Sequence, residues 1–215
     1  MKDRYFGLIF VSLCVLLLAG CGGGSGAPGS SGSADTGILI QSVQPLVSTP
    51  TSITGGTTGA STSSPDIDAA IHLCSDGKPE KGLFRTDASL NITAAALNPN
   101  TASDPFPASV EQCTITYLKA NEDPGAPIIP EFTEYPNCPI LDGDNTCLIT
   151  FMDIQRKEDF WDALTGGTNE PVTHYYDPVH YVGVINCSYV NAFGKTGNFQ
   201  TEVDVWLTDF ETCTG

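Results

Sequence analysis

The chain has 215 residues, of which 9 are Lys or Arg and 25 are Asp or Glu, and its formal net charge is −16. This charge argues against a nucleic-acid partner, because a phosphate backbone is bound through Lys and Arg. It argues equally against binding to anionic lipid headgroups. The length suits one domain, or two small ones, with a hydrophobic core.

The chain starts with a short basic segment that leads into an apolar one. Lys2 and Arg4 precede residues 5–19, which are apolar or small almost throughout and include Cys14. As a helix this run would be about 22 Å long, which is short for a membrane span of roughly 20 apolar residues. Residues 1–20 are therefore predicted to be a secretory signal peptide, with an uncleaved membrane anchor as the alternative. Cys14 is interpreted as a small hydrophobic residue that is lost with this peptide.

The apolar run ends in Leu18-Ala19-Gly20-Cys21, and this motif resembles the lipobox of bacterial lipoproteins. The resemblance covers only the first 21 residues. It implies that the Cys21 thiol receives a diacylglyceryl group, that the preceding peptide is cleaved, and that the new N-terminus is acylated, so that several chains anchor the protein. Gly22 follows and no aspartate is near, which in enteric relatives favours the outer membrane. The domain would then lie in the periplasm or at the cell surface.

The segment after Cys21 is predicted to be a flexible tether that extends to residue 65. Residues 22–29 are all Gly, Ser, Ala or Pro, and Asp35 is the only charged residue between positions 22 and 65. Such a composition buries too little apolar area to offset its ordering entropy, and as a coil it would span about 35–40 Å. The stretch ILIQSVQPLV at 38–47 interrupts it. This stretch is either a first strand of the domain or an apolar patch within the tether.

Beyond the tether the chain contains an even number of cysteines, at Cys74, Cys113, Cys138, Cys147, Cys187 and Cys213. The absence of CxxC and CxxCH spacing argues against a zinc ribbon, haem attachment and thioredoxin-like chemistry. In an exported chain such a set predicts three disulfides, which typically contribute about 2–4 kcal/mol each. The spacing by itself leaves all 15 pairings open.

Several segments are rich in β-branched and aromatic residues and are bounded by turn residues, which predicts strands. They lie at 68–74, 83–96, 110–118, 147–154, 180–190 and 199–210. In the last one, Val203, Val205 and Leu207 alternate with Glu202, Asp204 and Trp206, so one aliphatic face is expected to point inward. Residues 194–197 are predicted to form the hairpin loop before this strand.

One helix is predicted at 155–164, with Asp153 as its N-cap and Gly166 at its end. Ile154, Trp161 and Leu164 are expected to form its buried stripe. Many short strands with Gly and Pro turns predict a mainly β fold: a disulfide-stapled antiparallel β-sandwich over residues 66–215, with one short helix. The general resemblance is to Ig-like or fibronectin-like modules, without a family-specific motif.

The cysteine spacing raises the hypothesis of an internal duplication. Cys74, Cys113 and Cys138 are separated by nearly the same intervals as Cys147, Cys187 and Cys213. This predicts repeat units at 66–139 and 140–215, either as tandem modules or as halves of one sandwich. Chance spacing is the alternative, because the intervening residues do not correspond.

Asp142, Asp144 and Asn145 form the best candidate for a cation site. Short acidic and amide side chains in a tight loop offer the oxygen ligands that Ca²⁺ takes, whereas an Asp-Gly dipeptide also forms an ordinary turn. Further EF-hand ligands are missing, so calcium and a plain turn both remain open. No other cofactor is expected.

Residues 174–181 concentrate aromatic and histidine side chains. Tyr175, Tyr176 and Tyr181 are predicted to contact an envelope protein or a glycan, because aromatic rings stack on such partners. A metal held by His174 and His180 is a second interpretation. A loop that leads into a strand, with tyrosines packed at its edge, is the third.

Catalytic motifs such as GxSxG, HExxH and a phosphate-binding loop are absent from the sequence, and an enzyme is not expected. The sequence favours a membrane-anchored lipoprotein that presents a non-enzymatic β-sandwich for binding or structure. The alternatives are an accessory subunit or assembly factor of an envelope secretion or appendage machine, and a cell-envelope hydrolase.

Overall fold

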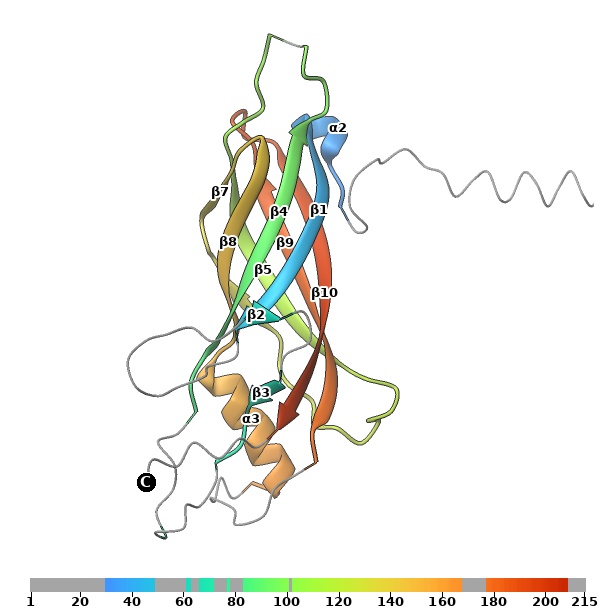
Figure 1. Ribbon diagram of the computed structural model, residues 1–215, viewed down its shortest axis with the longest axis vertical. Coiled ribbons are helices and arrows are strands. Elements are labelled where there is room, and N and C mark those ends of the chain that lie inside the picture. The colour runs from blue at the N-terminus through green and yellow to red at the C-terminus, as the bar shows by residue number, and fades with distance from the viewer. Residues whose placement is uncertain are drawn as a thin grey trace, which may run out of the picture.

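The mainly β prediction is confirmed by a computed structural model, which describes residues 30–48, 61–62, 66–71, 77, 83–100, 102–167 and 177–208. One sheet has the strand order β2-β1-β4-β8, and the other has the order β3-β10-β9-β5-β6, with β7 also paired to β5. The two sheets form an elongated sandwich (Figure 1). The strands are β1 (Ile38–Ser48), β2 (Ser61–Thr62), β3 (Asp66–Asp68), β4 (Thr86–Ala96), β5 (Ala108–Lys119), β6 (Phe132–Glu134), β7 (Cys138–Ile140), β8 (Gly143–Met152), β9 (Val179–Val190) and β10 (Thr196–Thr208).

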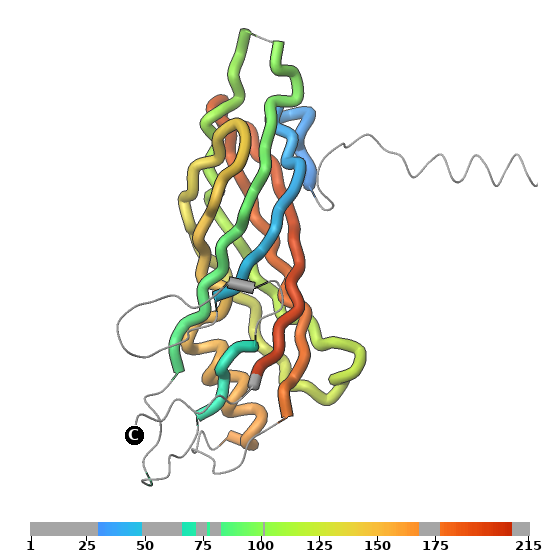
Figure 2. Tube along the Cα trace, viewed as in Figure 1, coloured from blue at the N-terminus to red at the C-terminus, as the bar shows by residue number. Residues whose placement is uncertain are grey.

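The core lies between the inner faces of the two sheets. Period-two alternation places Val203, Val205 and Leu207 of β10 inside, as predicted, and leaves Glu202 and Asp204 exposed. β9 and β10 are paired from Thr196 opposite Val190 to Leu207 opposite Val179, so the predicted hairpin is confirmed. Its connection lies at residues 191–195 and not at 194–197, because Thr196 and Gly197 already belong to β10. Figure 2 shows how these long strands twist around the shared core.

Two disulfides bind the sandwich together in different ways. Cys138 of β7 is bonded to Cys147 of β8, and this bridge joins the edges of the two sheets. Cys113 and Cys187 face each other on the adjacent strands β5 and β9, so their bridge lies within one sheet. In this it differs from the core disulfide of Ig-like domains, which joins the two sheets.

The folded domain starts well before the predicted boundary at residue 66. Residues 38–48 form β1, which pairs along β4 from Ile38 opposite Ala96 to Val47 opposite Ala88. Ile38, Ile40 and Val47 are fully or almost fully buried. The apolar stretch is therefore the first strand of the domain and not a patch within a tether. The predicted tether end at residue 65 is wrong, since β1 already belongs to the folded core. The Gly-, Ser- and Thr-rich residues on both sides of the stretch had suggested a longer tether.

The two predicted repeat units do not form separate modules in the described part of the chain. Strands from 66–139 and from 140–215 are interleaved in both sheets, with β4 beside β8 and β5 beside β9. Both described disulfides also join one unit to the other. The predicted strand at 68–74 is corrected where the structure describes it: β3 ends at Asp68 after a short parallel pairing with β10, residues 69–71 are not in a strand, and residues 72–74 lie outside the described residues.

The helix prediction is confirmed at both ends and corrected on its buried face. α3 spans Ile154–Thr165, the Asp153 side chain accepts a hydrogen bond from the Arg156 N–H, and Gly166 ends the helix in a left-handed conformation. The four-residue helix α2 (Ser33–Thr36) precedes β1. α3 lies at one end of the sandwich (Figure 1).

The buried side of α3 includes a lysine. Ile154 is 46 % exposed, whereas Lys157, Phe160 and Trp161 are buried and Leu164 is partly buried. These four residues have the i, i+3, i+4, i+7 spacing of one helical face. Ile154 lies on the same side, seven positions before Trp161, but it is the first residue of the helix and stays exposed. Burial lowers the pKa of Lys157 to about 8, against the opposing effect of the Asp68 carboxylate.

Two glycines make room for aromatic rings inside the sandwich. A Cβ atom built on Gly183 of β9 would lie 2.5 Å from Cζ of Phe151, which reaches across from β8. A Cβ atom on Gly197 would collide with the Tyr189 ring on the neighbouring strand. Neither glycine has a positive φ angle, so close approach of an aromatic ring, and not backbone conformation, is the reason for glycine at these positions.

Candidate functional site

The outer face of β5, β9 and β10 carries two adjoining rows of uncharged polar side chains. The register places Ser188 between Gln112 and Asn198, and Asn186 beside Thr114. Because side chains on a strand alternate between its faces, these residues share one face, and their neighbours Cys113, Ile185 and Phe199 are buried in the core.

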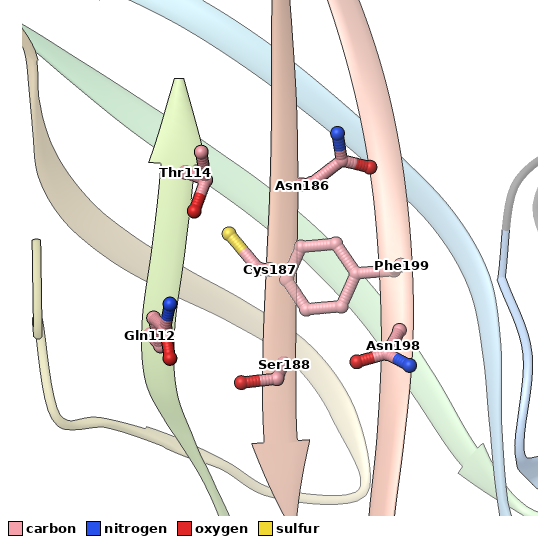
Figure 3. A pocket seen from close by; sticks show the side chains of 7 residues that line it. All are labelled: Gln112, Thr114, Asn186, Cys187, Ser188, Asn198 and Phe199. Atoms are coloured by element: carbon pink, nitrogen blue, oxygen red, sulfur yellow. The ribbon is translucent and has the colours of Figure 1, made fainter. Parts of the chain in front are cut away.

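These rows line a shallow depression of about 340 Å³. Figure 3 shows its lining residues, which are Gln112, Thr114, Asn186, Cys187, Ser188, Asn198 and Phe199. None of them is charged. Among the described residues, no hydrogen bond engages the side chains of Gln112, Asn186, Ser188 or Asn198, whereas Thr114 exchanges one with Thr133 over 3.0 Å. The depression therefore presents amide and hydroxyl groups whose hydrogen-bonding capacity is directed to solvent.

A charged cluster lies farther along the same sheet, around His180 of β9. Its imidazole Nδ1 contacts Glu122, and Nε2 is 3.0 Å from an Asp204 carboxylate oxygen. The His180 backbone N–H donates to Asp123 over 2.8 Å. The ring stacks on Trp206 of β10, with centroids 4.3 Å apart and planes 9° apart. Only 13 % of the His180 side chain is exposed, because the loop that contains Glu122 and strand β10 both contact its imidazole.

The surroundings of His180 stabilise its protonated form. Partial burial lowers the pKa of His180, but the hydrogen bonds to Glu122 and Asp204 outweigh burial and raise the pKa overall above its ordinary value of 6.5. The hydrogen bond with His180 lowers the pKa of Glu122 in turn. A histidine whose pKa is raised in the folded state stabilises that state fully below pH 6.5. That contribution disappears as the pH rises through the raised pKa.

We expect the fluorescence of Trp206 to titrate with His180. An imidazolium stacked on indole affects its emission differently from a neutral ring, so the emission should change with a midpoint above pH 6.5. The matched control is His180→Gln, which keeps the second tryptophan, Trp161, but removes the titrating ring. A midpoint at or below 6.5, or an identical transition in the variant, would contradict a raised pKa for this histidine.

The predicted acidic loop is a tight turn that holds itself together. The Asn145 side chain accepts from the Leu141 N–H over 2.8 Å and donates to the carbonyls of Leu141 and Gly143. Asp144 accepts a hydrogen bond from Thr93 over 2.8 Å. No group of three or more His, Cys, Asp or Glu side chains placed to hold a metal ion occurs in the described ranges. Calcium binding by Asp142 and Asp144 stays a prediction.

The predicted aromatic surface is only partly covered by the structure. His174, Tyr175 and Tyr176 lie outside the described residues. Tyr181 is fully buried, its hydroxyl donates to the Pro127 carbonyl over 2.8 Å, and burial raises its pKa. Tyr181 is therefore a core residue and not part of a partner-binding surface, because the alternation of β9 turns it inward.

Four of the six predicted disulfide cysteines are confirmed as bonded: Cys113, Cys187, Cys138 and Cys147. Cys21, Cys74 and Cys213 lie outside the described residues. In the part of the chain that the structure describes, no helix has the length and apolar character needed to span a membrane.

Sequence reasoning missed both features of this face. Gln112, Asn186 and Asn198 resemble the solvent side of any strand, and only their register brings them together. The one available signal for the charged cluster was His180 at the start of a predicted strand, because its partners come from distant segments. No protein-family model, curated protein or solved structure matches the chain.

Proposed function

We propose that the protein is a lipid-anchored lipoprotein of the bacterial envelope, with a β-sandwich that acts as a non-enzymatic binding or structural module. The observation that carries this proposal is the motif Leu18-Ala19-Gly20-Cys21 at the end of an apolar run, followed by a Gly- and Ser-rich stretch. Bonded cysteines support it, because disulfides persist in oxidising compartments outside the cytosol.

The position of Ser31, near the start of the described residues, adds a geometric element to the proposal. Ser31 and Asn198 of β10 exchange two backbone hydrogen bonds of 2.9 and 3.2 Å. Only residues 22–30 separate Cys21 from this contact. The proposed anchor would therefore hold the module by the end where α2 and the β9–β10 turn lie, close to the membrane surface.

Replacing Cys21 with serine should abolish incorporation of labelled palmitate and release the protein from the membrane fraction. The reason is that one thiol carries the diacylglyceryl group, and anchoring depends on several acyl chains acting together. The measurement is palmitate labelling and membrane fractionation of the chain expressed with its native N-terminus. Cys14→Ser is the matched control and should be labelled normally. Continued labelling of Cys21→Ser would refute the anchor assignment.

A further inference from the structure

The neutral rows on β5, β9 and β10 differ from the rest of this strongly acidic protein. Acidic residues outnumber basic ones by 25 to 9 in the chain, yet no charged side chain lines the depression. A ligand with its own charge would find no ion-pair partner there, and an anion would also be repelled by the negative field of the protein. The electrostatics therefore select an uncharged ligand.

The lining groups also select a ligand that is rich in hydroxyls. Each carboxamide of Gln112, Asn186 and Asn198 offers two N–H donors and one carbonyl acceptor, and the Ser188 hydroxyl both donates and accepts. A sugar hydroxyl has the same dual capacity. Neighbouring strands lie about 4.8 Å apart, so the row from Asn198 through Ser188 to Gln112 spans roughly 10 Å, which is the scale of a disaccharide.

The outer face of the other sheet is a useful comparison, because it is also polar. There, the Thr146 hydroxyl donates to the side-chain amide oxygen (Oδ1) of Asn91 over 3.2 Å, and the Thr93 hydroxyl donates to the Asp144 carboxylate over 2.8 Å. Those side chains are engaged with one another, and one of them is charged. The depression on β5, β9 and β10 instead leaves its amides open to a ligand, and its volume of about 340 Å³ falls at the lower end of the range for ligand pockets.

From these observations we infer that the depression on β5, β9 and β10 is a binding site for a neutral oligosaccharide. The inference rests on the proposed function as a binding module, but not on the lipid anchor. The site is open and replaces bound water with sugar hydroxyls, an exchange that gains little free energy per hydrogen bond. We therefore expect a dissociation constant on the order of 1 mM for a short neutral oligosaccharide.

The test is a titration of the full chain, labelled with ¹⁵N and held in detergent micelles. Two-dimensional NMR spectra are recorded at each step of the titration. The probes are maltohexaose, cellohexaose and chitohexaose, each added up to about 10 mM so that millimolar binding is detected. At least one probe should shift the side-chain amide signals of Gln112, Asn186 and Asn198. The amides of Asn91 and Gln44, on the other outer face, should stay in place.

Two variants with one chemical change each separate this site from the rest of the surface. Asn186→Asp replaces an amide with a carboxylate of the same shape, removes two donors and adds charge, and should weaken binding at least tenfold. Asn91→Asp makes the same change on the opposite sheet and should leave affinity unaltered. An oligogalacturonate of similar length carries negative charge and should bind more weakly than the neutral probes.

The inference is overturned if no neutral probe shifts the three amides, if the shifts map to the Asn91 face, or if Asn186→Asp binds as well as the unaltered chain. Equal or tighter binding of oligogalacturonate would also overturn it. None of these NMR and binding results depends on palmitate labelling or membrane fractionation. A failure here therefore leaves the anchor proposal intact, and a failure of Cys21 lipidation leaves the titration valid.

Discussion

Removal of the Cys113–Cys187 disulfide by the paired substitutions C113A and C187A should lower the free energy of unfolding by about 4 kcal/mol. The bridge closes a loop with a sequence separation of 74 residues, against 9 for Cys138–Cys147. In the chain-entropy account, a longer closed loop restricts the unfolded state more, so removing the short bridge should cost less, about 2–3 kcal/mol. Urea unfolding of the two paired variants, compared with the unaltered protein, measures both effects.

The comparison between the two paired variants is the informative part of this experiment. Both bridges tie the same core, and Cys113, Cys147 and Cys187 are buried, so burial contributes to both losses. A larger loss for Cys138→Ala with Cys147→Ala would mean that joining the two sheets matters more than the length of the closed loop.

The predicted third disulfide involves the two remaining cysteines of the mature domain, Cys74 and Cys213. β3 and β10 run parallel, with Asp68 opposite Thr208, and Cys74 and Cys213 follow a few residues after these strands. Both cysteines lie outside the described residues, and we expect them to be bonded to each other, because the other four predicted disulfide cysteines are already paired. Unfolded, unreduced protein that has lost its signal peptide should show no free thiol besides any unmodified Cys21. Peptide mapping should recover Cys74 linked to Cys213.

The substitution Gly183→Ala should lower the free energy of unfolding by about 1–3 kcal/mol, although it adds a single methyl group. The new Cβ atom would be 2.5 Å from Cζ and 2.8 Å from Cε2 of Phe151. That ring is fully buried, so it has no free space into which to move. Thermal or urea unfolding measures the loss.

A matched control and a double-mutant cycle identify the cause. Gly125→Ala places its methyl group where no atom lies within 4 Å, and it should change stability by less than about 0.5 kcal/mol. In a Phe151→Leu background, Gly183→Ala should cost clearly less than in the unaltered protein, because the colliding ring atoms are gone. An undiminished cost in that background would assign the effect to the strand backbone instead of the ring.

Local patterns in the sequence determined several elements of this fold. The cap residues Asp153 and Gly166 bracket the helix that formed between them, because capping hydrogen bonds involve residues within one turn of each other. The alternation around Val203 and Val205 correctly predicted which face of β10 is buried, since the period of a strand is independent of its partner. Composition and cysteine number likewise indicated a disulfide-stapled β fold.

The remaining features depend on which strands become neighbours, and local patterns do not contain that information. Residues 38–48 become a core strand because β4 offers a partner, and Tyr181 becomes a core residue because β9 turns it inward beneath Pro127. The Cys113–Cys187 pairing follows from the β5–β9 register. The same register gathers the neutral side chains, and long-range contacts bring Glu122 and Asp204 to His180. These features arise from pairing between segments far apart in the chain, and only the tertiary structure decides that pairing.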